Sequence, residues 1–146
     1  MSHSFVGNFI HCVFSTKERR NIIPADLQQN LWAYLHGIGR NLHIKVIGVG
    51  GTRNHVHILM QLPTTISLSE AVQKLKANSS RWIGEQGITF SWQKGYGAFS
   101  VSPSMLGTVR AYIRNQEEHH KRRTFDEELS LWLRKCGVSD LTHALD

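Results

Sequence analysis

The chain has 146 residues, which is the length of a single domain and is enough to enclose a hydrophobic core. Hydrophobic residues make up 40% of the chain and charged residues 19%, a balance that excludes an intrinsically disordered protein. No apolar run approaches the roughly 18 residues that span a bilayer, and the N-terminus lacks the basic region of a signal peptide. We therefore expect one domain over residues 1–146, cytoplasmic and without a membrane partner.

The formal net charge is +6, before any of the nine histidines is counted as charged. This charge favours a polyanionic partner such as a nucleic acid, although a solvated basic surface is an equally good interpretation of charge alone. The two cysteines, Cys12 and Cys136, show no metal-binding spacing and fit a reducing compartment. Cys12 lies in an apolar strand-like run, so we expect it in the core.

The first half of the chain alternates strand and helix patterns. Residues 5–15 are rich in β-branched and aromatic side chains, which predicts a strand. Apolar residues at helical spacing predict a helix over 26–42, after Pro24. Residues 43–51 and 55–62 predict two further strands, and the short glycine-containing connection between them predicts an antiparallel hairpin.

The second half begins with Ser67 and, three residues later, Glu70, a capping-box pattern that starts a helix. Short strand-like pieces follow over 88–102, then one helix over 103–123 and a short amphipathic helix over 126–137. The resulting βαββαβ order predicts an α+β, ferredoxin-like antiparallel sheet with helices on one face, plus C-terminal helices.

His55 and His57 are candidate metal ligands in the third predicted strand. Alternate side chains of a strand share a face, so the two imidazoles point the same way, with their Cα atoms roughly 6.6 Å apart. Two imidazoles at that separation can converge on one divalent cation. The ordinary interpretation of an isolated His-x-His pattern, a pair of histidines on a solvated strand face, remains open at this point.

Tyr112 and Gln116 are four residues apart in the predicted helix over 103–123 and would therefore lie on one helix face. They share an apolar stripe with Val109 and Ile113, and a tyrosine on such a stripe is usually part of the core. Gln116 is the unusual member, because a buried amide needs a hydrogen-bond partner. Its carbonyl oxygen is a candidate third metal ligand.

The ordered set of sequence patterns resembles the single-tyrosine HUH transposases (His–hydrophobic–His) of small bacterial insertion sequences, including the REP-associated tyrosine transposases. The resemblance covers nearly the whole chain. It includes FIHCVFSTKERR at the first strand, RNHVHILM at the third, WQKGYGAFSVS before the long helix, and VRAYIRNQEEHH within that helix.

The resemblance implies that His55, His57 and Gln116 bind Mg²⁺ or Mn²⁺ and that Tyr112 is the nucleophile. It implies cleavage and rejoining of single-stranded DNA at hairpin-flanked element ends through a 5′-phosphotyrosine intermediate. Members of the family work as dimers, in which the tyrosine helix can complete the partner's active site. We therefore expect a homodimer, with Tyr112 acting either in its own subunit or in the partner.

Basic residues in three turns are candidate DNA phosphate contacts. They are Lys17, Arg19 and Arg20, then Arg53, then Lys121, Arg122 and Arg123. Solvated loops are an equally good interpretation of these residues. The aromatic residues Trp92, Tyr96 and Phe99 could stack on unpaired bases, but their pattern favours core packing.

Two other functions compete with the transposase. A non-catalytic nucleic-acid-binding domain of ferredoxin-like fold would explain the charge, but it leaves His55, His57 and Gln116 without a role. A metal-dependent hydrolase that activates water would use the histidines but not Tyr112, and no acidic metal ligand stands out near them in the sequence.

Overall fold

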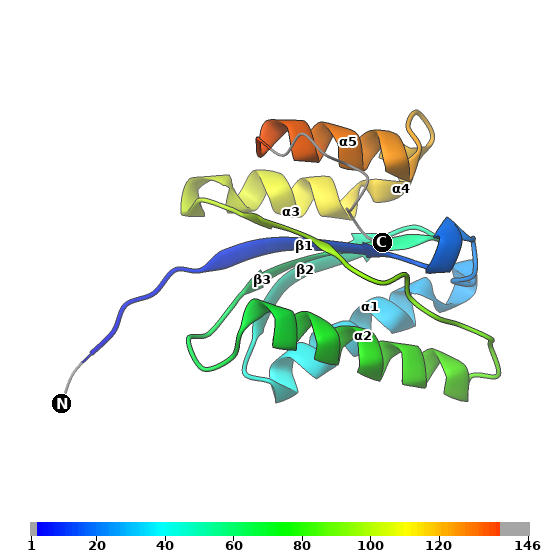
Figure 1. Ribbon diagram of the computed structural model, residues 1–146, viewed down its shortest axis with the longest axis horizontal. Coiled ribbons are helices and arrows are strands. Elements are labelled where there is room, and N and C mark those ends of the chain that lie inside the picture. Colours follow the sequence, from blue (N-terminus) through cyan, green and yellow to red (C-terminus); the bar gives the residue numbers. More distant parts are fainter. Residues whose placement is uncertain (1–2, 138–146) are drawn as a thin grey trace.

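The computed structural model describes residues 3–137, which form one four-stranded sheet covered by helices (Figure 1). The elements, in chain order, are β1 (Phe9–Ser15), α1 (Gln28–Asn41), β2 (Lys45–Gly51), β3 (His55–Gln61), α2 (Leu68–Glu85), β4 (Gly97–Ser100), α3 (Leu106–Arg114), α4 (Gln116–His120) and α5 (Phe125–Lys135). Three single turns of 3₁₀ helix, Lys17–Arg19, Ala25–Leu27 and Pro103–Met105, precede or join these elements.

The sheet has the strand order β2-β3-β1-β4, and all neighbouring strands are antiparallel. With α1 and α2 as the two connecting helices, this order confirms the predicted ferredoxin-like α+β fold. The β2–β3 hairpin predicted from the sequence is also present. None of the described helices is long and apolar enough to cross a membrane.

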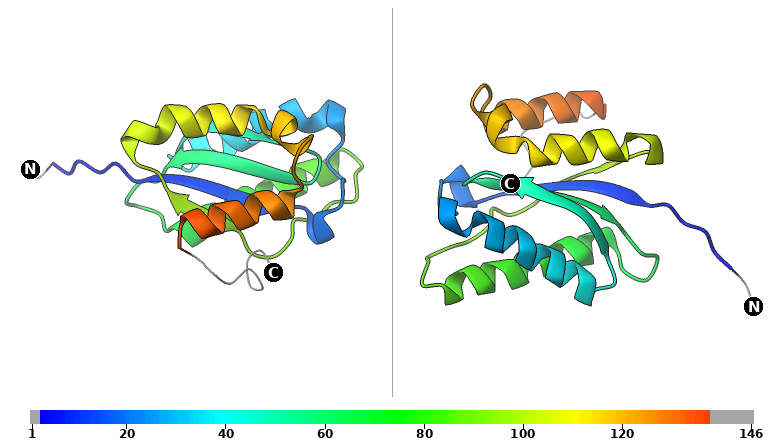
Figure 2. Two further views of the ribbon diagram at one scale, coloured as in Figure 1. Left: turned by 90° about the horizontal axis from the view of Figure 1, so that it is seen from above. Right: turned by 180° about the vertical axis from the view of Figure 1, so that it is seen from behind.

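Helices cover both faces of the sheet (Figures 1 and 2). Below it, α1 and α2 pack on one set of alternate strand residues and form the main hydrophobic core, which includes Cys12 as expected. Above it, α3 packs on β2 and β3, whereas α5 packs on Val13 of β1 and Phe99 of β4. The second set of alternate strand residues therefore faces the gap between α3 and α5.

The helix predicted over 103–123 is broken at Asn115. Asn115 has φ −97° and ψ 24°, and its amide donates to the carbonyls of both Ala111 and Tyr112, so α3 ends there and α4 begins at Gln116. Asparagine is favoured at helix ends because its conformational preferences suit such positions. The break leaves Gln116 at the first position of a new helix rather than one regular turn after Tyr112.

Gly50 in β2 allows α3 to lie unusually close to the sheet. A Cβ atom at this position would sit 2.2 Å from the carbonyl oxygen of Ile113 in α3. Only glycine permits such an approach of two backbones. Because Gly50 is also the register partner of His57, this contact places the end of α3 beside the histidine strand.

The helix α5 begins with a complete capping box between Thr124 and Glu127. Its apolar residues Phe125, Leu129 and Leu133 are buried against β1 and β4. In the 88–102 segment, by contrast, only β4 forms a strand, so most of the strand-like residues predicted there lie in irregular structure.

Candidate metal centre and nucleophile

His55 and His57 lie on the same face of β3, as the alternation of a strand requires. Both are buried, with 0% and 1% of their surfaces exposed. The face that carries them is covered by α5 and by the α3–α4 junction, so the interpretation as a solvated pair of histidines is wrong. Two buried imidazoles that do not face water must find polar partners inside the protein.

Gln116 supplies one of those partners. Its side chain is 1% exposed, and Oε1 lies 2.8 Å from His55 Nε2. The amide Nε2 donates to Glu128 Oε2 at 3.0 Å. The structure therefore brings together the three residues predicted as metal ligands, and the break at Asn115 allows Gln116 to point towards the strand.

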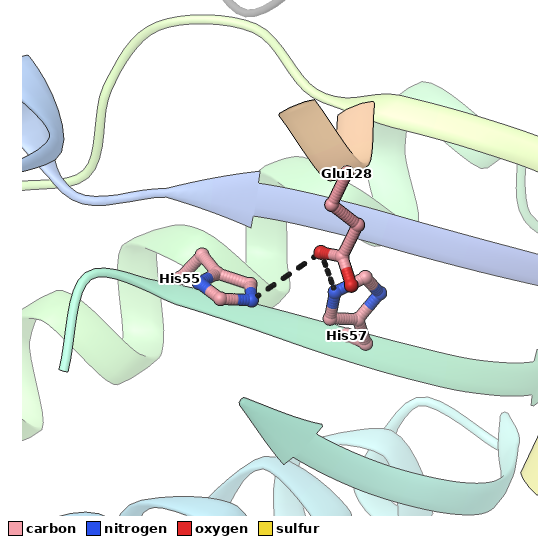
Figure 3. A group of neighbouring side chains, drawn as sticks. All are labelled: His55, His57 and Glu128. Carbon is pink, nitrogen blue, oxygen red and sulfur yellow. Dashed lines mark hydrogen bonds and ion pairs between the residues drawn. The ribbon is translucent and has the colours of Figure 1, made fainter. Parts of the chain in front are cut away.

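Glu128 is the residue of this site that sequence reasoning missed. It projects from α5 between the two histidines (Figure 3), with Oε1 2.9 Å from His57 Nε2 and 3.6 Å from His55 Nε2. The side chain is 3% exposed. An acid at helical spacing from the buried Phe125 and the half-buried Trp132 was the available signal, because carboxylates are almost never fully buried without a partner.

The donor atoms of His55, His57 and Glu128 all lie within 4.8 Å of one another, so they can bind one ion. His55 Nδ1 is 2.8 Å from Asn54 Oδ1, an acceptor that favours a proton on Nδ1. His55 Nε2 lies 2.8 Å from a second acceptor, Gln116 Oε1, and because a neutral imidazole carries only one proton, one of the two contacts has no hydrogen to share. A cation relieves such a convergence of acceptors, and imidazole, amide and carboxylate donors fit a divalent metal.

Tyr112 lies beside this cluster in the same chain. Its hydroxyl donates a short hydrogen bond to Glu128 Oε2 and accepts one from Trp132 Nε1 at 3.2 Å. The Tyr112 ring is 5.9 Å from the His57 ring, centroid to centroid. The tyrosine is therefore adjacent to its own chain's histidines, and its half-buried ring is not simply a core residue.

Burial and the Glu128 carboxylate shape the protonation of the cluster. Burial, with a smaller effect of His57, lowers the pKa of His55 to about 3, so this imidazole is neutral. Burial and the hydrogen bond to Glu128 raise the pKa of Tyr112 above its usual value. Burial would raise the pKa of Glu128, but hydrogen bonds from His120 and His57 outweigh it and hold the pKa well below the usual range.

Two further histidines border the cluster. His120, at the end of α4, has Nε2 3.1 Å from Gln116 Oε1 and 3.2 Å from Glu128 Oε1. His11, in β1, is completely buried, and its Nε2 lies 2.7 Å from His57 Nδ1. Neither was among the residues selected from the sequence. His120 lies four positions after Gln116, a spacing that was available as a signal, whereas only the fold places His11 of β1 next to β3.

Several of the predicted DNA-binding residues form ion pairs within the chain: Arg19 with Asp126 at 2.6 Å, Arg20 with Glu18 at 2.6 Å, and Lys121 with Glu118 at 2.9 Å. Lys17 lies in the same turn as Arg19, on the exposed surface. Arg53 is held by the backbone, because its Nε donates to the carbonyl of Ile23 at 3.2 Å.

A hollow of about 510 Å³ adjoins the cluster and gathers basic residues from two of the three turns. Its walls include Arg53, Lys121, Arg122 and Arg123, together with His120, which also contacts the site. Trp92 and Phe99, in contrast, are buried in the hydrophobic cores, as their pattern favoured, and Tyr96 packs partly against them.

Comparison with known proteins agrees with the family resemblance seen in the sequence. A sequence model described as "Transposase IS200 like" matches residues 5–116, which include His55, His57, Tyr112 and Gln116. The matched range ends before α5, so Glu128 lies outside it. The transposases for insertion sequence element IS200 of Salmonella typhimurium and Salmonella typhi are each 25% identical to this chain over 129 residues. These matches cover 83% of this chain and 82% of the relatives.

Two solved structures share the fold. A crystal structure assigned as a transposase from Deinococcus radiodurans superposes with a TM-score of 0.62 at 19% identity, covering 80% of this chain and 96% of the other. The structure of a REP-associated tyrosine transposase bound to a REP hairpin superposes with a TM-score of 0.62 at 16% identity, covering 99% and 97%.

Proposed function

The chain belongs to the IS200-like transposase family, and we propose that it cleaves and rejoins single-stranded DNA at the hairpin-flanked ends of a mobile element. One observation carries the proposal. The hydroxyl of Tyr112 and Nε2 of His57 bind the two oxygens of one carboxylate, Glu128. A candidate nucleophile is therefore adjacent to the only cluster in the described part of the chain that could hold a metal ion.

We propose that His55, His57 and Gln116 hold a divalent ion, Mg²⁺ or Mn²⁺, and that Glu128 is a fourth donor. The Glu128 carboxylate adds a negative charge to an otherwise neutral set of donors. This charge suits Mg²⁺ and Mn²⁺, which both prefer oxygen ligands. When bound, such an ion neutralises the charge of a phosphate and polarises its P–O bonds, which supplies several kcal/mol. The ion's identity is tested by metal substitution.

In the proposed reaction, the phenolic oxygen of Tyr112 attacks the phosphorus of a DNA phosphodiester. An O–P bond to the tyrosine forms, the P–O3′ bond breaks, and the departing 3′ oxygen takes up a proton. The phenol proton passes along its hydrogen bond to Glu128 and on to solvent, and solvent supplies the proton that the departing 3′ oxygen takes up. Only about one free phenol in a thousand is ionised at pH 7. Burial and the hydrogen bond to Glu128 raise the pKa of Tyr112 further, so the tyrosine needs a proton acceptor in contact with it.

The products are a 5′-phosphotyrosine and a free 3′-hydroxyl. Because the covalent link retains the phosphodiester bond energy, a second 3′-hydroxyl can reverse the step and join a new strand without ATP. Hydrolysis by water would lose that energy. A tyrosine nucleophile therefore suits a protein of a transposase family better than an activated water does.

We further propose that Tyr112 acts on the site of its own chain. The Tyr112 ring is 5.9 Å from the His57 ring within one chain, so no partner is needed to complete the cluster. Independently of this assignment, we propose that the protein forms a homodimer, as the family resemblance implies. Sedimentation analysis with and without DNA tests the oligomeric state.

The DNA strand is proposed to approach through the basic hollow beside the cluster. Arg53, Lys121, Arg122 and Arg123 would contact phosphates there, and Lys17, Arg19 and Arg20 would extend the contact along the neighbouring turn. The fold relative bound to a REP hairpin supports a hairpin as the DNA substrate. A hollow of about 510 Å³ is within the usual range of ligand sites.

The test uses labelled single-stranded oligonucleotides that contain the palindromes flanking the coding region. Each is incubated with the protein and Mg²⁺ or Mn²⁺ and analysed on a denaturing gel. A covalent protein–DNA adduct, mapped to Tyr112 by peptide mass spectrometry and absent in Tyr112→Phe, would support the proposal. The Tyr34→Phe variant, with its tyrosine on the opposite side of the sheet, is the matched control.

The same gel tests the competing functions. Cleavage that survives Tyr112→Phe would indicate a water nucleophile. This hypothesis is chemically reasonable because Glu128 supplies the acidic metal ligand that a hydrolase of this kind needs. Binding of the hairpins without cleavage by any divalent ion would favour the non-catalytic nucleic-acid-binding domain.

A further inference from the structure

His11 is the buried polar residue that the proposed reaction does not use. It lies in the middle of β1, on the sheet face that carries His57, and none of its surface is exposed. Its Nε2 lies 2.7 Å from His57 Nδ1. Its second nitrogen, Nδ1, is buried and has no hydrogen-bond partner within residues 3–137. A buried nitrogen of this kind needs an explanation.

The contact between two neutral imidazoles requires one N–H and one lone pair. His57 Nε2 lies 2.9 Å from Glu128 Oε1, so when no ion is bound the proton of His57 belongs on Nε2. His57 Nδ1 then carries a lone pair and accepts a hydrogen bond from His11 Nε2–H. In this state the isolated His11 Nδ1 carries only a lone pair, which is easier to bury alone than an N–H.

A metal-binding His57 reverses this arrangement. Nε2 must offer its lone pair to the ion, so the proton moves to Nδ1 and is donated to His11 Nε2. His11 must then carry its own proton on Nδ1. The net charge of the pair does not change. A carboxylate, the frequent partner of a metal-binding histidine, could accept in the loaded state but could not donate in the metal-free state.

We propose that His11 is a positioning residue of the metal centre, which fixes the ring of His57. When the ion binds, both imidazoles change from the Nε2–H tautomer to the Nδ1–H tautomer. This inference rests on the proposed function, since it takes the His55–His57 cluster as the metal site. His11 does not touch the ion or the DNA in this proposal. It determines how readily His57 presents Nε2 as a ligand.

The surroundings of His11 restrict its movement. Its ring is edge-on to Trp132 of α5 at 4.7 Å and to Phe99 of β4 at 6.1 Å, centroid to centroid. A ring packed between aromatic side chains cannot easily turn to present Nδ1 to His57 instead. The ring therefore keeps one orientation, and the proton, not the side chain, has to change position.

The first test measures Mn²⁺ affinity of the DNA-free protein by electron paramagnetic resonance. We expect His11→Leu, which has similar volume but no hydrogen-bonding group, to weaken Mn²⁺ binding by about 10- to 100-fold. His11→Gln, whose amide can donate or accept, should retain most of the affinity. The matched control is Val13→Ala, on the same strand face but without a polar contact to His57.

The second test follows the tautomers directly. Long-range ¹H–¹⁵N spectra of the imidazole rings distinguish a proton on Nδ1 from one on Nε2. We expect His11 to change from the Nε2–H to the Nδ1–H form when Mg²⁺ or Zn²⁺ is added, and His57 to change likewise. This signal does not depend on activity, and a purely structural role for His11 would not produce it.

The outcomes separate this inference from the proposed function. If the unaltered protein binds no Mn²⁺, or if His57→Ala binds it as well as the unaltered protein does, the metal site itself is wrong. If His57→Ala abolishes binding but His11→Leu binds normally, and His11 keeps its proton on one nitrogen throughout, the role of His11 alone is overturned. If His11→Leu does not fold, the imidazole ¹H–¹⁵N spectra of the unaltered protein, with and without metal, still test whether His11 changes tautomer.

Discussion

On β3, Ile58 points towards α1 and α2, whereas its neighbour His57 points towards α3 and α5. The same alternation divides β1, where Cys12 enters the apolar core and His11 enters the polar cluster. The lower face of the sheet therefore buries mostly hydrocarbon, whereas the upper face buries a cluster of polar groups beside two smaller apolar clusters. The buried polar residues of the upper face are His11, Ser15, His55, His57, Gln116 and Glu128.

The difference assigns different tasks to the two layers. Burial of apolar side chains below the sheet provides stability that does not depend on any single contact. The polar cluster above it depends on individual hydrogen bonds, because the loss of one partner leaves a buried polar group unpaired at a cost of about 1–3 kcal/mol. Changes on the lower face should therefore alter stability, and changes on the upper face should alter metal binding and cleavage.

The largest effect is expected from mixing two variants that are each inactive. Tyr112→Phe and His57→Ala should each lower the rate of adduct formation by roughly 10³-fold or more, because each removes a member of a unit that acts together. If Tyr112 serves its own chain, an equal mixture of the two remains inactive on the denaturing gel. Recovery of up to a quarter of the activity of the unaltered protein would instead show that the tyrosine acts on a partner's metal site.

A direct test of the two faces compares neighbouring residues of β3. Ile58→Ala should lower the free energy of unfolding by about 2–5 kcal/mol, since it leaves a cavity in the core below the sheet. The Mn²⁺ affinity of the folded protein should be unchanged. His57→Ala should abolish the increase in the free energy of unfolding that Mn²⁺ produces. Urea titrations with and without Mn²⁺ measure both quantities.

Reduced Mn²⁺ affinity in folded Ile58→Ala would contradict the comparison, because it would show that the two layers are coupled through the strand. The more conservative Ile58→Val, expected to cost about 0.5–1.5 kcal/mol, provides a folded sample if the alanine variant is too unstable to study.

A smaller effect is expected where α3 meets the sheet. Gly50→Ala would place a methyl group 2.2 Å from the carbonyl oxygen of Ile113, so α3 must move away and carry Tyr112 with it. A displacement of about 1 Å in a reacting group can lower a rate roughly 100-fold. Gly48→Ala is the matched control on the same strand, because its methyl group would meet only the side chain of Arg110, at 3.5 Å. Single-turnover cleavage rates of the two variants should differ accordingly.

The elements with a strong local pattern could be predicted from the sequence. The β-branched and aromatic composition of β1 and the helical periodicity of α1 and α2 are properties of neighbouring residues. The break at Asn115 is different, because the helical pattern continues through it and the packing of Gln116 against His55 decides the outcome. The short β4 likewise depends on its pairing with β1, not on its own composition.

Only the part of the site that depends on neighbouring residues could be predicted from the sequence. His55 and His57 are two residues apart, so their shared face follows from strand geometry. Glu128 is 71 residues away from His57, and only the placement of α5 brings the two together. His11 gave a weak signal as a histidine in an apolar strand, but its partner depends on the pairing of β1 with β3.

The last effect, which is the smallest when expressed per pH unit, concerns the acid stability of the protein without bound metal. An unfolded histidine has a pKa of about 6.5, whereas the pKa of buried His55 is about 3. Between these values the unfolded chain binds the additional proton, so stability is complete above about pH 6.5 and falls as the pH decreases towards 3. His55 alone should account for up to about 1.4 kcal/mol per pH unit in this window. Urea midpoints measured across the window give the slope.

His55→Gln should reduce that slope by the contribution of one proton, because it removes the titrating group but keeps a polar side chain beside Gln116. Glu128 acts in a different window. Its pKa is held below the usual value, so its contribution is present above the unfolded value of about 4.3 and is lost only at lower pH. An equal slope in His55→Gln and the unaltered protein would mean that His55 does not bind an additional proton on unfolding in this window.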